Sequence, residues 1–199
     1  MTTTDVQPTD GVDEEHEHMP GEGDMWAFVI FESLVFTSYF CVYLYFRTQN
    51  EQAFLEAQAA LDLPLGILDT IVLLTSSWIM ALCMRHARAG RYDAARKLAL
   101  ATVVLGVAFS MLKMTEWVHL ISEGHTFTSD ASQFMQHFFF LTGMHGIHLL
   151  IGFVTLGILI HHLSTPTIRS DRTIETCGTY WHTVDLFWVL IFALLYVVR

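Results

Sequence analysis

The longest apolar stretch of the chain, FMQHFFFLTGMHGIHLLIGFVTLGILIHH at residues 134–162, is long enough for a helix to cross a bilayer. A helix rises about 1.5 Å per residue, so about 20 residues span a hydrocarbon core about 30 Å thick. Four further stretches of this kind fill most of the 199-residue chain, at 25–46, 66–84, 98–121 and 178–198. The sequence therefore predicts an all-α polytopic membrane bundle of five transmembrane helices.

Composition also favours an integral membrane protein. Hydrophobic residues make up 53% of the chain and charged residues only 15%, whereas a soluble domain carries about 25% charged residues. The net charge of −10 comes mainly from residues 1–24, which hold eight Asp or Glu and no Lys or Arg. We expect residues 1–19 to form a disordered acidic tail and residues 20–199 to form one five-span domain.

The cysteines and the basic residues argue against several classes of site. Cys41, Cys83 and Cys177 form no CxxC or CxxCH motif, so a disulfide scaffold, an iron–sulfur cluster and covalent haem attachment are unsupported. No basic patch indicates nucleic-acid binding. The N-terminal residues include no positively charged segment followed by a short apolar core, so a cleavable signal peptide is not indicated.

The charges of the loops predict the orientation of the chain. Segments 85–97 and 163–177 carry seven Lys or Arg residues, whereas the opposite side carries only Arg47 and Arg199. Because positive residues favour cytoplasmic loops, we expect these two segments and the N-terminus in the cytoplasm, and the C-terminus outside.

Small and aromatic residues predict how the spans pack. Three glycines in the fourth span are expected to let another helix approach closely: Gly143, Gly146 and Gly152. Six aromatic residues near span ends are typical of a belt at the membrane interface: Tyr43, Tyr45, Trp117, Tyr180, Trp181 and Tyr196. A short helix is expected over residues 51–61 in the loop before Pro64.

Ionisable residues lie inside these spans, where burial costs free energy and marks candidate sites. Glu32 lies in the first span, and three roles remain open for it: a proton carrier, a lipid head-group contact and a polar link between helices. Lys113 and Glu116 lie three residues apart in the third span and so share a helix face. We expect a structural ion pair there rather than a transport site.

The last two spans contain similar pairs. His145 and His148 share a face of the fourth span, and His182 and Asp185 share a face of the fifth. No carboxylate or third histidine completes a metal-ligand set nearby, so hydrogen bonding between helices is favoured over metal binding. By their depth, four residues either converge on one polar cluster or face separate neighbours: Glu32, His148, His182 and Asp185.

Several of these residues lie in segments that resemble the third subunit of haem–copper respiratory oxidases, cytochrome c oxidase among them. The segments TGMHGIH (142–148) and YWHTVDLFW (180–188) resemble the TGxHGxH and YWHxVDxxW motifs of that family, in the same order and spacing. Weaker matches are Phe31-Glu32-Ser33, Glu116, and Pro64-Leu-Gly with LLTSS at 73–77. The likeness extends from about residue 19 to residue 199. The five spans are similar to the short bacterial form, which lacks the first two of seven.

The resemblance implies a subunit of the bacterial plasma membrane with no catalytic residue, haem, copper or other metal of its own. Haem and copper are then expected in the catalytic subunit I, which this chain would contact. Subunit II and bound phospholipid would be further neighbours. The chain would support O2 reduction to water and proton translocation by stabilising subunit I and its proton uptake. Glu32 would match the reactive buried carboxylate of the family. The proton-linked or lipid-contacting candidates are Glu32, His145, His148, His182 and Asp185.

Lys113 departs from the neutral polar residue that is usual in oxidase members. Its presence is similar to a branch that includes accessory membrane proteins of nitric oxide reductase systems, and this alternative partner stays open. The electron donor of an oxidase complex, cytochrome c or quinol, also stays open. An independent transporter is disfavoured because no pair of broken helices indicates a central site.

Overall fold

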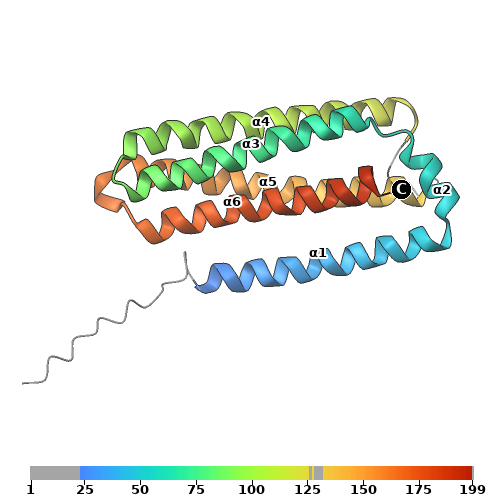
Figure 1. Cartoon of the computed structure of the whole chain (residues 1–199), viewed down its shortest axis with the longest axis horizontal. Coiled ribbons are helices and arrows are strands. Elements are labelled where there is room, and N and C mark those ends of the chain that lie inside the picture. Colours follow the sequence, from blue (N-terminus) through green and yellow to red (C-terminus); the bar gives the residue numbers. More distant parts are fainter. Residues whose placement is uncertain (1–22, 126, 128–131, 199) are drawn as a thin grey trace, which may run out of the picture.

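Five long helices run side by side along the molecule, and a short helix crosses one end (Figure 1). The structure is a computed structural model that describes residues 23–125, 127 and 132–198. The tail expected at 1–19 lies outside the described residues. The elements are α1 (Gly23–Gln49), α2 (Glu51–Gln58), α3 (Leu63–Arg88), α4 (Tyr92–Ser122), α5 (Gln133–Ser164), a 3₁₀ turn η1 (Pro166–Ile168), α6 (Asp171–Phe192) and a π-helical turn η2 (Ala193–Val197).

The predicted spans are all helical, and α1, α3, α4, α5 and α6 with η2 are each long and apolar enough to cross a membrane. The helices begin before the predicted spans, and polar residues cap the start of α3, α5 and α6. Ser132 accepts a hydrogen bond from the backbone N–H of Met135 and Ser170 accepts one from Thr173. The predicted all-α membrane bundle is therefore confirmed, and the short helix predicted at 51–61 corresponds to α2.

The connections define two ends of the bundle. The α2 end carries α2 and η2, while the Gly90 end carries the α3–α4 turn and η1 (Figure 1). Gly90 adopts a φ of 71°, a left-handed conformation that favours glycine, and so allows α4 to turn back along α3. Seven Lys or Arg residues lie at the Gly90 end: Arg85, Arg88, Arg91, Arg96, Lys97, Arg169 and Arg172.

The core lies among α3, α4, α5 and α6, which pack closely, whereas α1 contacts α5 and α6 more sparsely. Trp181 on α6 fills the centre, where its indole N–H donates to Ser76 Oγ at 3.0 Å. Gly106 on α4 and Gly152 on α5 leave space for the Trp181 ring. A Cβ atom would lie 2.9 Å from that ring at Gly106 and 3.1 Å from it at Gly152. The close approach expected at Gly152 is therefore present, whereas Gly146 has nothing within 4 Å.

Most of the aromatic residues expected in an interfacial belt are buried instead. Tyr43, Tyr180, Trp181 and Tyr196 are at most 5% exposed, whereas Tyr45 is 61% exposed. The expectation was wrong for these four because their rings fill gaps between helices and their polar atoms find partners inside the bundle. Tyr180, for example, donates to the carbonyl oxygen of His148 at 3.1 Å.

The C-terminal turn is held by the first two helices. Arg47 Nη1 donates to the carbonyl oxygen of Val198 at 2.6 Å. Gln58 Nε2 donates to the carbonyl oxygens of Leu195 and Val198 at 2.8 and 3.1 Å. The last carbonyls of a helix have no partner within it and need one in an apolar medium. α1 and α2 therefore complete the end of α6.

Candidate functional site

Four buried side chains meet near the α2 end and form what we call the ion cluster: Asp69, Lys113, Glu116 and Tyr196. Lys113 Nζ lies 2.9 Å from Asp69 Oδ2 and donates to Glu116 Oε2 at 2.5 Å. The Tyr196 hydroxyl donates to both oxygens of Glu116, at 2.7 and 2.9 Å. The cluster thus joins α3, α4 and η2, and the Trp188 ring covers the ammonium group at 4.4 Å.

The structure therefore places Lys113 against Glu116, as their spacing predicts, but the sequence reasoning missed Asp69 and Tyr196. Asp69 is an ionisable residue within the second predicted span, which is itself a signal of a site. Tyr196 carried no such signal, because aromatic residues near a span end are common at membrane interfaces.

A second contact joins α1 to α5. Glu32 Oε2 lies 3.1 Å from His148 Nε2, and His148 Nδ1 lies 2.8 Å from the carbonyl oxygen of Met144. A carbonyl oxygen can only accept, so Nδ1 carries a hydrogen. Two states fit this contact. Either Nε2 of a neutral His148 accepts a hydrogen bond from a protonated Glu32, or the imidazolium of a protonated His148 donates one to the Glu32 carboxylate. In either state one proton lies between Glu32 and His148.

His182 and Asp185 do not join this pair. His182 Nδ1 lies 2.7 Å from the hydroxyl oxygen of Ser77 on α3. Asp185 is 3% exposed, and neither of its carboxyl oxygens has a hydrogen-bond partner among the described residues. His182 therefore faces α3, whereas Glu32 and His148 join α1 to α5. The four residues therefore do not form one cluster, and they do not all have separate neighbours either. Glu32 and His148 contact each other, whereas His182 and Asp185 make no hydrogen bond to that pair among the described residues. Ser77 was not predicted as a member.

His145 lies apart from both contacts. Its ring packs against Phe109 and Trp188, with centroids 5.7 and 5.2 Å apart. Neither ring nitrogen has a hydrogen-bond partner among the described residues. Within that part of the chain, no group of three or more His, Cys, Asp or Glu residues is placed to hold a metal ion.

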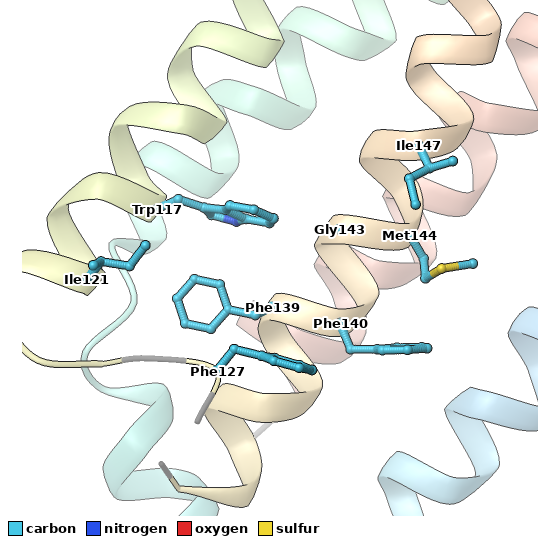
Figure 2. Close-up of a pocket in the computed structure, with 8 residues that line it drawn as sticks. All are labelled: Trp117, Ile121, Phe127, Phe139, Phe140, Gly143, Met144 and Ile147. Atoms are coloured by element: carbon cyan, nitrogen blue, oxygen red, sulfur yellow. The ribbon is translucent and has the colours of Figure 1, made fainter. Parts of the chain in front are cut away.

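Apolar hollows open on the surface of the bundle. One of about 440 Å³ lies between α4 and α5, where Trp117 packs edge-to-face on Phe139 and Gly143 forms part of the wall (Figure 2). Another of about 350 Å³ lies between α1 and α5, lined by Phe36, Tyr39 and their neighbours. Their linings are almost wholly carbon, and lipid acyl chains have the chemistry to fill them.

Known proteins resemble the chain over nearly its whole length. A family model described as cytochrome c oxidase subunit III matches residues 21–198. The cytochrome bo(3) ubiquinol oxidase subunit 3 of Pseudomonas aeruginosa is 29% identical over 193 residues, which cover 94% of this chain and 90% of that protein. The cytochrome c oxidase subunit 3 of Alkalihalophilus pseudofirmus is 30% identical over 174 residues, covering 86% and 83% respectively. The heme-copper oxidase subunit I+III of Aeropyrum pernix is 27% identical over 195 residues, covering 92% of this chain but 24% of that longer protein.

Proposed function

Because the chain belongs to the cytochrome c oxidase subunit III family, we propose that it is a subunit without redox centres in a haem–copper terminal oxidase. The complex reduces O2 to water and translocates protons, and the chain stabilises the catalytic subunit and its proton uptake. The observation that carries this proposal is the family match over residues 21–198, which includes every described helix.

The geometry of Glu32 supports a link to protons. The proton between Glu32 and His148 is held on the α1–α5 side of the bundle, where the Glu32 side chain is 15% exposed. A group that holds a proton at a partly open position can pass it to a neighbouring carrier. This arrangement favours a proton-linked role for Glu32 over a purely structural one.

A relative supports catalytic subunit I as the partner. The Aeropyrum pernix protein is named subunit I+III, so a single chain there carries both subunits. In this chain α1 leaves most of its surface uncovered, with large exposed apolar residues such as Phe31 and Leu34. We assign this face, together with that of α3, to contact with subunit I, with subunit II and phospholipids as further neighbours.

Orientation follows from charge. The seven Lys or Arg residues at the Gly90 end favour a cytoplasmic position for that end. The N-terminus then lies in the cytoplasm of the bacterium and the C-terminus outside the plasma membrane. Labelling of single cysteines introduced at positions 51 and 91 from one side of sealed vesicles tests this, and labelling of position 91 from outside would contradict it.

The partner and the electron donor are tested by one purification. The chain is tagged and purified in mild detergent, and O2 consumption is measured with reduced cytochrome c and with a quinol. We expect a haem–copper catalytic subunit in the preparation and fewer turnovers before inactivation when this chain is removed. A nitric oxide reductase catalytic subunit in its place, or an unchanged lifetime without the chain, would contradict the proposal.

A further inference from the structure

The carboxyl groups of the ion cluster outnumber its cations. Asp69 and Glu116 would each carry a negative charge, whereas Lys113 is the only cation that contacts them among the described residues. Two negative charges and one positive charge leave a net charge of −1. Asp69 is fully shielded from solvent and Glu116 is 3% exposed, so water cannot offset this excess.

The groups around the cluster do not supply a second cation. The Trp188 and Tyr196 rings lie 4.4 and 5.3 Å from Lys113 Nζ, a placement that favours the charged ammonium but adds no charge. Two other ionisable residues lie near the cluster. Asp62, just before α3, is acidic and so adds no positive charge. His145 on α5 makes no hydrogen bond to the cluster. An unpaired carboxylate in this interior would be strongly unfavourable.

The two carboxyl groups differ in their partners. Glu116 accepts hydrogen bonds from Lys113 and from Tyr196, which together stabilise its ionised form. Asp69 has the ammonium group 2.9 Å from Oδ2, but neither of its oxygens accepts a hydrogen bond of good geometry among the described residues. A proton on Asp69 therefore neutralises the cluster without disturbing the contacts of Glu116.

We propose that the ion cluster binds one proton at neutral pH, held on Asp69, and is thus a second proton-binding site of the chain. It lies near the α2 end, on the helices α3, α4 and η2, and shares no residue with the Glu32–His148 pair. The site follows from the charges of this chain alone, so it does not depend on the identity of the partner subunit.

Infrared difference spectroscopy of the complex in lipid nanodiscs tests the proposal. The protein is labelled with ¹³C at the aspartate side-chain carboxyl, and wild type is compared with Asp69→Asn at neutral pH. We expect a carbonyl band of a protonated aspartic acid that shifts in D2O and is lost in Asp69→Asn. The exposed control Asp93→Asn should leave this band unchanged.

Two further variants give results that only charge balance explains. Glu116→Gln should abolish the Asp69 band, because the remaining carboxylate then pairs one-to-one with Lys113. Lys113→Met should keep that band and add a protonated glutamic acid. A wild-type spectrum without the Asp69 band, or an undiminished band in Glu116→Gln, would overturn the proposal. The Glu116→Gln comparison stands even where Asp69→Asn fails to assemble.

Discussion

At the scale of single residues, we expect the buried polar groups of this chain to hold protons and charges in defined places. Glu32 and His148 share a proton because the other imidazole nitrogen is committed to the Met144 carbonyl. The amide of a glutamine can occupy the same space but cannot take up or release a proton. The role of Glu32 is therefore separable from its packing.

Glu32→Gln should leave the initial rate of O2 consumption of the complex close to wild type but shorten its active lifetime. The reason is that proton delivery to the catalytic subunit then loses one of its carriers. The measurement is the total number of turnovers before inactivation, followed with an oxygen electrode. Glu51→Gln, on the exposed surface of α2, is the control. An unchanged lifetime for Glu32→Gln would leave it only a packing role.

Lys113→Met should destabilise the chain by about 3–5 kcal/mol, because it leaves buried carboxyl groups without their cation. The double variant Lys113→Met with Glu116→Gln should lose less, since one of the two acids is removed with the cation. Thermal unfolding in detergent compares the two. Equal losses would show that Lys113 and Glu116 do not act as a pair.

At the scale of helices, glycine and tryptophan decide how closely α4, α5 and α6 approach. Gly152→Leu should destabilise the bundle by about 1–3 kcal/mol, because its side chain overlaps the Trp181 ring. Gly157→Leu on the same helix is the matched control, as nothing lies within 4 Å of that position. The midpoint of thermal unfolding should fall for the first variant only, and equal shifts would contradict this packing.

The link between α1 and the C-terminal turn gives a prediction of its own. Arg47→Met should cost about 1.5–3 kcal/mol, because it removes a charged donor from the Val198 carbonyl. Hydrogen exchange should rise in η2 and in the last turn of α1. Arg91→Met at the exposed Gly90 end should leave both segments protected. Unchanged exchange in the Arg47 variant would mean that α2 alone holds the C-terminus.

The helices themselves could be predicted from the sequence, because an apolar run of sufficient length is a local property. The contact of Lys113 with Glu116 was equally accessible, since a spacing of three residues fixes a shared face. Asp69 with Lys113 and Ser77 with His182 could not be paired in this way. These partners come from different helices, and which faces meet depends on packing against residues such as Trp181.

At the scale of the whole molecule, α3, α4, α5 and α6 form a compact bundle and α1 lies at its side (Figure 1). Many large apolar side chains of α1 are exposed. A membrane protein can leave such a surface to lipid, but a subunit can also offer it to a partner. The two proposed proton positions, at Glu32–His148 and at Asp69, lie on helices that pack against one another within the chain. We therefore expect the chain to act on its neighbour through protons and packing.

The most direct test of this role measures haem and copper in two preparations of the full chain. One is the chain expressed alone, and the other is the complex that it forms with its partner subunits. A subunit without redox centres predicts a colourless, copper-free chain and a complex that contains both. Stoichiometric haem or copper in the chain expressed alone would contradict it.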